Sequence, residues 1–371
     1  MKKVLILGVA SVQMDAILQL KEMGIKTYAC AQADDGPGSK FADQFELINF
    51  VDEDKVIELL NEQEIDCVYS VGSDIAMPVS TAISEKMSLP YFVKSEIARI
   101  CNNKNKMRDY FGKDFLGNIK YQTLESINEK VILDYPFIMK PSDSQGQRGV
   151  RLINNFDEFL VYFEESKTYS RSGLVIIEEF ITGPELSVNA YIVDGDVAFM
   201  VTSDREVWSE YQGGLIHKHV VPSRVTNSQI NNNLIDLVSR TAKKLGVTNG
   251  PLYFQIKLSD NLPYIIEVTP RLDGCHMWNL LKHYTGVNLI KLTFEHLLFG
   301  KTEELQNFKH SSSEYILEFV CEEPNTIVDN SKYDIPSNAL SSMKYYNNGD
   351  LIRPINGQFE KIGYFITEND R

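Results

Sequence analysis

The chain has 371 residues, 43% hydrophobic and 24% charged, which is typical of a folded globular protein of about two or three domains. Its formal net charge of −14 argues against a nucleic-acid or membrane-surface partner, because phosphate contacts need clustered Lys and Arg side chains. No stretch has the roughly 20 consecutive apolar residues that a membrane-spanning helix requires.

The cysteines and the N-terminus indicate a cytoplasmic protein. The five cysteines are far apart and form no CxxC pair, so we expect reduced thiols. The opening MKKVLILG has the lysines and apolar run of a signal peptide. The run is short and no cleavage site follows it, so we predict a first strand instead.

The first 95 residues alternate between predicted strands and helices. Strands are predicted at 3–8, 25–30 and 66–72, with helices at 12–23 and 52–65 between them. This alternation predicts a parallel sheet, as in nucleotide-binding folds. The turn after the first strand begins with Gly8 but lacks the later glycines of GxGxxG, so a nicotinamide oxidoreductase is a weakly supported alternative.

The rest of the chain is predicted to be mixed α and β. A helix is expected over 95–113, strands at 135–141, 150–153 and 174–182, and hairpins over 183–199 and 251–268. Two further helices are predicted at 228–245 and 286–299, and the residues after 300 read as strand-rich.

The second hairpin carries a charged residue in an apolar strand, Glu267 of YIIEVTPR. Gln255 lies on the other arm and Thr269 two residues further on, so all three oxygens are expected on one face. Such oxygens suit Mg²⁺, which usually also binds phosphates. The alternative is that Glu267 simply pairs with Arg271.

Two other segments have the features of a nucleotide site. Lys140 ends a strand before the loop SDSQGQRG, whose small residues can present backbone N–H groups to phosphate. In IIEEFITGPE, a strand leads into a turn with carboxylates beside it, which suits adenine and ribose. A surface loop and a solvated acidic face are the respective alternatives.

In this order, the motifs resemble the ATP-grasp superfamily of carboxylate–amine and carboxylate–thiol ligases, which includes D-alanine–D-alanine ligase, biotin carboxylase and the carbamoyl-phosphate synthase large subunit. The resemblance covers roughly residues 1–300. It implies an α/β domain at 1–95, one ATP-grasp subdomain with linker helices and a glycine-rich loop at 96–182, and a second with the metal site at 183–300. Residues 301–371 lie outside the resemblance and are a strand-rich region by their pattern alone.

The resemblance also implies the site residues and the Mg²⁺ cofactor. Lys104 of NNKNKMRDYF and Lys140 would hold phosphates, Glu185 would bind ribose, and Arg271 would bind the reacting oxygens. The nucleotide set is Lys104, Lys140, Ser144, Gly146, Glu178, Glu179, Phe180, Ile181 and Glu185, and the metal set is Gln255, Glu267 and Thr269.

Two departures from the family pattern reduce the charge of the metal site. Gln255 stands where the family has an acid, and Thr269 where it has asparagine. Both keep an oxygen ligand, but one negative charge is lost, which leaves the number of metal ions open. It also keeps a non-catalytic or regulatory ATP-binding protein as an alternative function.

The implied reaction joins a small-molecule carboxylate to an amine through an acyl phosphate, with ATP as co-substrate and a homodimer left open. We expect a lid over 203–222, hinged at Gly213-Gly214, with Lys218 as a catalytic contact and His217 and His219 as further candidates. The segment LDGCHMW after Arg271 is expected to line the acceptor pocket. Within it, His276 is as well explained as a core residue, and Cys275 as a small buried one.

Overall fold

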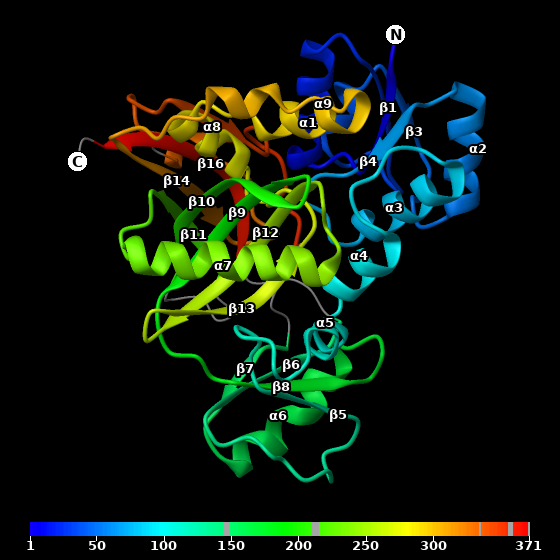
Figure 1. The fold of residues 1–371 in the computed structure, drawn as a ribbon. Helices are drawn as coiled ribbons and strands as arrows, with labels where there is room; N and C mark the ends of the chain where they lie inside the picture. The colour runs from blue at the N-terminus through cyan, green and yellow to red at the C-terminus, as the bar shows by residue number, and fades with distance from the viewer. Residues whose placement is uncertain (144–148, 209–214, 334, 355–358, 370–371) are drawn as a thin grey trace.

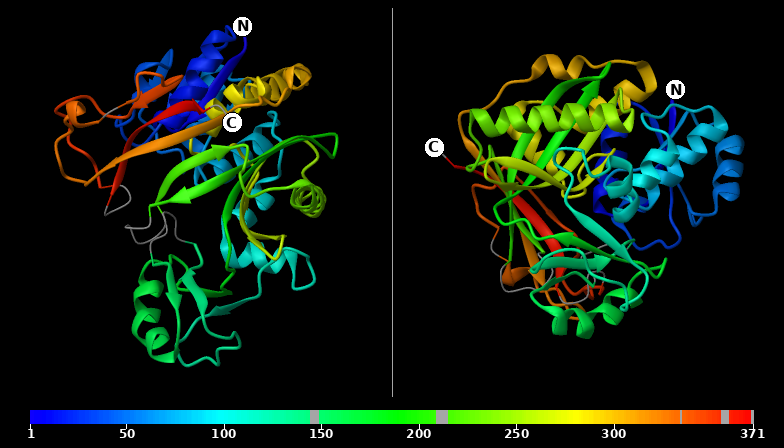
Figure 2. Two further views of the ribbon diagram at one scale, coloured as in Figure 1. Left: turned by 90° about the vertical axis from the view of Figure 1, so that its left-hand side faces the viewer. Right: turned by 60° about the horizontal axis from the view of Figure 1, so that its bottom comes forward.

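The computed structural model describes residues 1–143, 149–208, 215–333, 335–354 and 359–369 (Figure 1). They form an N-terminal α/β unit, a small antiparallel subdomain and a large antiparallel sheet. Figures 1 and 2 show the small subdomain projecting from the body formed by the other two parts. No helix within these ranges is both long and apolar enough to span a bilayer.

The N-terminal unit is the parallel sheet that the sequence predicts, with strand order β3-β2-β1-β4. Its core contains Leu5 and Leu7 of the sheet packed with Val56 and Ile83 of the helices. The elements are β1 Lys3–Leu7, α1 Ser11–Glu22, β2 Lys26–Cys30, the 3-10 turn η1 Pro37–Lys40, β3 Gln44–Glu46, α2 Glu53–Gln63, β4 Cys67–Tyr69 and α3 Ala76–Met87.

The strand order of this sheet determines which loops meet the rest of the protein. The chain direction of the crossovers reverses between β1 and β4, and ligands of open α/β sheets bind beyond the strand ends at such a point. The loop after β1 leads to Ser11, and the loop after β4 carries Asp74. Both loops therefore lie at the edge of the sheet where a substrate is expected.

The helix predicted over 95–113 is in fact two helices, α4 Ser95–Cys101 and α5 Lys104–Phe111. Asn103 separates them because its side chain accepts a hydrogen bond from the backbone N–H of Lys106 at 3.1 Å, and asparagine favours this N-cap position. The new helix start places Lys104 in the first turn of α5.

The small subdomain is an antiparallel sheet of order β5-β8-β6-β7 covered by one helix. Phe137 and Ile177 of the sheet pack against Phe159 and Phe163 of that helix. The elements are β5 Tyr121–Leu124, β6 Phe137–Pro141, β7 Arg151–Ile153, α6 Phe156–Thr168 and β8 Val175–Glu179.

The large sheet has the order β13-β12-β9-β10-β11-β14-β16-β15, and α7 lies across it (Figure 1). Tyr191 of β9 reaches α9, where its hydroxyl lies 3.2 Å from Nδ1 of His296. The elements are β9 Glu185–Val193, β10 Asp196–Val207, β11 Ile216–Val221, α7 Ser228–Leu245, β12 Gly250–Ser259, β13 Leu262–Thr269, α8 Met277–Thr285, α9 Leu289–Phe299, η2 Glu303–Asn307, β14 Glu314–Glu322, η3 Asn330–Lys332, β15 Ser341–Lys344 and β16 Glu360–Asn369.

Both predicted hairpins are present. The turn between β9 and β10 has positive φ at Asp194 and Gly195, and the turn between β12 and β13 has positive φ at Asp260 and Asn261. Two-residue turns with two positive φ angles match the twist of antiparallel strands, and Asn, Asp and Gly adopt them most readily. The β12–β13 turn therefore sets the register as far as Ile256, and an irregularity between Ile256 and Gln255 shifts it by one residue beyond that point.

The strands after residue 300 extend the large sheet. β14 pairs with β11, β16 pairs with β14, and β15 forms the edge. In this way β16 brings Lys361 opposite Cys321, inside the sheet.

The predicted lid over 203–222 is wrong for most of its length. β10 continues to Val207 and β11 begins at Ile216, so most of this segment is paired strand. Polar residues alternating on paired strands resemble a loop in sequence because only one face of the strand is fully buried. The proposed hinge, Gly213-Gly214, lies outside the described residues.

Candidate active site

Three charged side chains form a buried cluster in the small subdomain. Nζ of Lys140, at the end of β6, lies 2.6 Å from Oε2 of Glu178 on the neighbouring strand β8. Nε of Arg108, from α5, donates to Oε1 of the same carboxylate at 2.9 Å. All three side chains are almost completely buried.

Arg108 also ties the small subdomain to the large sheet. Its Nη1 donates to the carbonyl of Ile265 at 2.7 Å and its Nη2 to the carbonyl of Ile266 at 3.2 Å, both on β13. Nη1 further donates to Oδ1 of Asn118 at 3.1 Å. The guanidinium therefore links α5, β8 and the strand that carries Glu267.

The cluster has more positive than negative charge. Burial would raise the pKa of Glu178, but the charges of Arg108 and Lys140 outweigh it and lower that pKa to about 2. Burial lowers the pKa of Lys140 to about 8, and the charges of Arg108 and Lys104 add to this while Glu178 opposes it. One carboxylate shared between two cations, Arg108 and Lys140, leaves this site suited to a further anion.

Lys104 lies beside the start of the predicted phosphate loop. Its backbone N–H donates to the carbonyl of Ser142 at 3.0 Å. Asp143 is fixed by hydrogen bonds from the backbone N–H groups of Arg171 at 2.9 Å and Ser172 at 3.0 Å. Ser144 and Gly146 lie outside the described residues, so their predicted phosphate contacts stay predictions.

The predicted adenine segment follows directly from Glu178. β8 ends at Glu179, whose backbone N–H donates to the carbonyl of Lys120 at 2.9 Å, and Ile181 is buried just beyond. The Glu178 carboxylate itself faces Arg108 and Lys140. The roles assigned to Glu178, Glu179, Phe180 and Ile181 at adenine stay predictions.

The predicted metal residues face one another across β12 and β13. Gln255 lies directly opposite Glu267, and Thr269 opposite Tyr253. Within the described residues, the Glu267 carboxylate has no ion-pair partner, and Oγ1 of Thr269 is buried without a hydrogen bond. The simple pairing of Glu267 with Arg271 is therefore absent.

Glu185 lies on β9 next to these strands and is already engaged. It accepts a hydrogen bond from Nε2 of Gln255 at 2.6 Å and pairs closely with Arg205 of β10. The bond to Glu185 uses the amide nitrogen of Gln255, so the amide oxygen is the atom left for a metal. A ribose contact of Glu185 stays a prediction.

Arg271 pairs with the N-terminal unit. Its Nε and Nη2 lie 2.7 Å and 2.6 Å from Oδ1 of Asp74, in the loop after β4. The two loops approach closely, since a Cβ on Gly72 would lie 2.9 Å from Cα of Gly274. A narrow cavity of about 10 Å³ lies between Asp74 and the strand end at Thr269.

Of the three basic residues of β11, only His219 shares a face with the metal strands. His219 lies opposite Arg205, which contacts Glu185, whereas Lys218 lies opposite Glu206 and Glu318. Nζ of Lys218 and Nε2 of His217 both bind Glu318, at 2.9 Å and 3.0 Å. Successive strand residues point to opposite faces, so the geometry favours His219 over Lys218 as a site residue.

His276 is buried at the junction of the loop after Arg271 and helix α1. Its Nδ1 lies 2.8 Å from Oδ2 of Asp15, its Nε2 lies 3.5 Å from Oγ of Ser11, and its ring stacks on Tyr364. Its neighbour Cys275 is half-buried. These contacts favour a structural role for His276 in holding the loop against the N-terminal unit.

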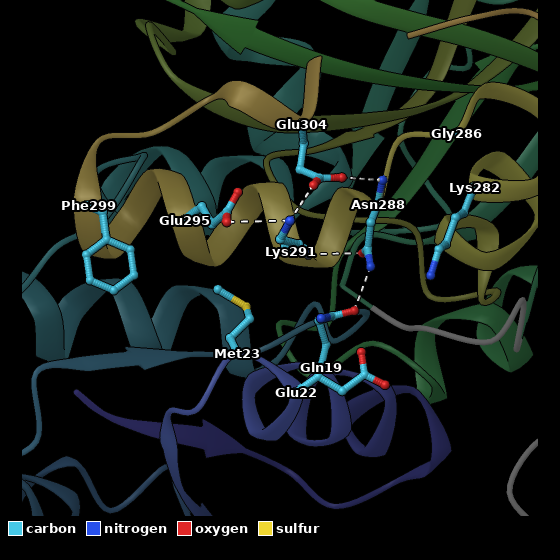
Figure 3. A pocket seen from close by; sticks show the side chains of 10 residues that line it. All are labelled: Gln19, Glu22, Met23, Lys282, Gly286, Asn288, Lys291, Glu295, Phe299 and Glu304. Carbon is cyan, nitrogen blue, oxygen red and sulfur yellow. Dashed lines mark hydrogen bonds and ion pairs between the residues drawn. The ribbon is translucent and has the colours of Figure 1, made fainter. Parts of the chain in front are cut away.

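A larger cavity, about 500 Å³, lies away from these residues, between α1 and α9 (Figure 3). Lys291 in its wall binds Glu304 at 2.6 Å and Glu295 at 3.7 Å. Asn288 donates to Gln19 at 2.6 Å. The central polar groups of this cavity therefore pair with one another, whereas the Glu267 carboxylate has no ion-pair partner among the described residues.

Sequence reasoning did not single out Arg108, Asp74 or Arg205. Arg108 follows Lys104 by four residues, and this spacing places both on one helix face, so the signal existed. Asp74 meets Arg271 across 197 residues, a contact that no local pattern encodes.

A protein-family model described as an ATP-grasp domain matches residues 133–278. The C-terminal section of the carbamoyl phosphate synthase large chain from Methanocaldococcus jannaschii is 25% identical over 336 residues, which covers 82% of this chain and 52% of that protein. The chain thus spans about half the length of this curated relative.

Solved structures show the same fold. An L-amino acid ligase from Bacillus licheniformis superposes with a TM-score of 0.82 at 18% identity, covering 100% of this chain and 94% of that one. The biotin carboxylase domain of a 2-oxoglutarate carboxylase from Hydrogenobacter thermophilus, in complex with MgADP, ADP and bicarbonate, gives 0.81 at 16% identity, covering 99% and 86%. At such identities the likeness establishes the architecture.

Proposed function

We propose that this chain, whose residues 133–278 match an ATP-grasp domain, is an ATP-dependent ligase that activates a carboxylate as an acyl phosphate and joins it to an amine. ADP and phosphate would be released. The N-terminal parallel sheet, on which the nicotinamide alternative rested, would then be the domain that precedes the ATP-grasp fold.

The main support for this proposal is that two neighbouring parts of the site carry unbalanced charges of opposite sign. The small subdomain has an excess of buried cations around Lys140, and the facing strand β13 has an unpaired carboxylate at Glu267. Arg108 connects the two. A nucleotide polyphosphate with its metal ion supplies both missing charges, since the phosphates suit the cations and the ion suits the carboxylate.

The residues present fit Mg²⁺ held jointly with a nucleotide. Glu267, Gln255 and Thr269 offer one carboxylate and two neutral oxygens, and Mg²⁺ commonly takes only one or two carboxylates when phosphates complete its shell. No group of three or more His, Cys, Asp or Glu side chains arranged for a metal occurs in the described part of the chain. The ion would neutralise charge on the transferring phosphoryl group.

Arg271 would stabilise developing negative charge on the substrate. It is nearly buried, and the Asp74 contact holds its guanidinium in place. A planar guanidinium binds two oxygens at once, which suits an acyl phosphate or the tetrahedral species formed from it.

Interception of the intermediate tests the reaction. With Mg²⁺, ATP and the correct carboxylate, hydroxylamine should capture the acyl phosphate as a hydroxamate, with one ADP formed for each hydroxamate. A panel of carboxylates would be screened for this product by its ferric complex and for ADP by chromatography. AMP and pyrophosphate in place of ADP would show adenylation and refute the acyl-phosphate route.

The second candidate is a non-catalytic or regulatory ATP-binding protein, which the single carboxylate of the metal site favours. Such a protein would be stabilised against heat by Mg–ATP. It would release no ADP with any carboxylate and amine, so the same screen separates the two functions.

Lys140→Ala is expected to weaken ATP binding by about tenfold or more, because a charge-assisted contact to phosphate is worth about 1.5–3 kcal/mol. Lys104→Ala should act in the same direction. Titration of ATP by calorimetry measures both. Lys167→Ala is the matched control, because Nζ of Lys167, on α6 of the same subdomain, donates to the carbonyl of Glu125 at 2.6 Å, away from the cluster. Unchanged affinity with both Lys104 and Lys140 replaced would refute the phosphate assignment.

A further inference from the structure

One face of the large sheet carries a buried polar cluster next to the metal strands. Ser203 and Arg205 of β10 lie on this face with His219 of β11, and Oγ of Ser203 lies 3.4 Å from Nδ1 of His219. Oγ of Ser187 lies 3.5 Å from the hydroxyl of Tyr253. The cluster continues from the strands that hold Glu267 toward the C-terminal strands.

Three buried polar atoms of this cluster have no hydrogen-bond partner among the described residues. They are Nε of Arg205, Nε2 of His219 and Oδ2 of Asp273. The side chains of Arg205 and His219 and the whole of Asp273 are more than nine-tenths buried. An unsatisfied buried polar atom costs about 1–3 kcal/mol, so three in one region point to a ligand that satisfies them.

Two charges in the cluster are not balanced by a partner. Lys361, on β16, makes no ion pair within the described chain and lies 3.7 Å above the ring of Phe319. Asp273 makes none there either, and burial raises its pKa in spite of Arg271, Arg205 and Lys361 nearby. Arg205 and Arg271, by contrast, are each paired with a carboxylate.

Cys275 lies between the two unbalanced charges. Its sulfur is 3.8 Å from Nζ of Lys361, and its backbone N–H donates to Oδ1 of Asp273 at 3.2 Å. The site therefore presents a cation and an anion a short distance apart. A ligand that carries an ammonium and a carboxylate on the same carbon atom complements both charges.

We propose that this cluster binds the amine substrate and that the substrate is a free α-amino acid. Asp273 receives its ammonium group, and Lys361 with Nε of Arg205 receives its carboxylate. The inference rests on the proposed ligase function, because it assigns the second substrate of that reaction.

The position of Asp273 gives the orientation. Asp273 lies near enough to Arg271 for their charges to interact, and Lys361 lies on β16. An amino group on Asp273 would therefore be on the side of the acyl phosphate, with the carboxylate toward β16. The Asp273 carboxylate takes one proton from the ammonium, the freed nitrogen lone pair attacks the acyl carbon, and the carbon–oxygen bond to phosphate breaks. Phosphate leaves with that electron pair and takes the second proton lost as the amide forms.

Heat protection tests the site without knowledge of the carboxylate substrate. The unfolding temperature of the full chain would be measured with Mg–ADP and increasing concentrations of each common amino acid, its C-terminal amide and its N-acetyl derivative. At least one amino acid should raise the unfolding temperature. Its amide, which lacks the carboxylate, should need a concentration about tenfold or more higher for the same rise. The N-acetyl derivative, which lacks the ammonium group, should be similarly weak.

Variants test the assigned residues. Lys361→Gln should make the amino acid and its amide protect at nearly equal concentrations. Lys361→Arg keeps the charge and should restore the preference for the amino acid over its amide. Asp273→Asn should reduce the preference for the amino acid over its N-acetyl derivative. The ratio within one variant is unaffected by a general loss of stability.

The results distinguish a failure of the amino-acid assignment from a failure of the proposed ligase function. If Mg–ATP protects the protein but amides and simple amines protect as well as amino acids, or if no amino acid protects, the amino-acid assignment is wrong and the ligase proposal stands. A preference that survives in Lys361→Gln would also overturn it. If neither Mg–ATP nor Mg–ADP protects, the proposed function and this inference fall together.

Discussion

Glu267→Gln is expected to abolish turnover at every Mg²⁺ concentration that can be tested. Glu267 is the carboxylate among the three predicted metal ligands, and within the described residues no ion pair shares its charge. Two opposite unit charges about 4 Å apart attract by about 4 kcal/mol at an effective dielectric of 20, before desolvation reduces the net gain. With only neutral oxygens left, the metal would be held by the nucleotide alone.

Gln255→Glu is the complementary variant, and the structure makes its effect depend on the metal. The new carboxylate would lie beside Glu185, which now accepts a hydrogen bond from the Gln255 amide at 2.6 Å. Without Mg²⁺, like charges would meet and the variant should unfold at a lower temperature than wild type. With Mg–ATP the added charge should lower the Mg²⁺ requirement several-fold, because even a quarter of the attraction above has that effect.

Titration of Mg²⁺ at saturating ATP measures both effects through ADP release. Ser259→Ala, at the far end of β12, is a control for changes in that strand. Full activity of Glu267→Gln at low Mg²⁺ would mean that the metal is bound elsewhere.

The parts of the fold that local patterns encode were predictable from the sequence. Helix α7 occupies the predicted residues 228–245, since its apolar residues recur at helical spacing. The hairpin turn sets the pairing of β12 with β13 as far as Ile256 and Ile265. Gln255 then lies opposite Glu267 because the register shifts by one residue between Gln255 and Ile256, which the turn does not encode.

What the sequence could not show depends on long-range pairing. Lys361 reaches Cys275, 86 residues earlier in the chain, only because β16 pairs with β14 within the large sheet. The choice between Lys218 and His219 depends on the pairing of β10 with β11, which contains an irregularity between Glu206 and Val207. A shift of one residue in register exchanges the two faces of a strand, and nothing local in this segment fixes it.

Arg108 illustrates the same limit for a single side chain. In α5 it is one of several charged residues, and a charged helix position is usually solvated. In the structure its side chain is completely buried and donates to Glu178 and to two carbonyls of β13. Its environment is created by three separate segments of chain.

Arg108→Met is expected to destabilise the protein by about 3–5 kcal/mol, the usual cost of removing one partner from a buried ionic cluster. The substitution keeps most of the side-chain volume but leaves Glu178 with one cation and the carbonyls of Ile265 and Ile266 without their donor. Arg99→Met is the matched control, because Arg99 is 56% exposed and lies 3.9 Å from Glu53. An exposed pair of that kind contributes about 0–1 kcal/mol, so the control should unfold almost as wild type does.

The free energy of unfolding at acid pH provides a second test of Arg108→Met. Glu178 has a pKa of about 2 in the folded protein, below its ordinary value of 4.5, so its contribution to stability is present above pH 4.5 and is lost as the pH falls from 4.5 toward 2. Removing the Arg108 charge should raise the folded pKa of Glu178 and shrink this contribution. Arg108→Met should therefore lose less stability than wild type between pH 4.5 and 2, as urea unfolding at each pH would measure. Equal losses in the two proteins would show that Arg108 does not hold the charge of Glu178, and that the cluster beside β13 is built in some other way.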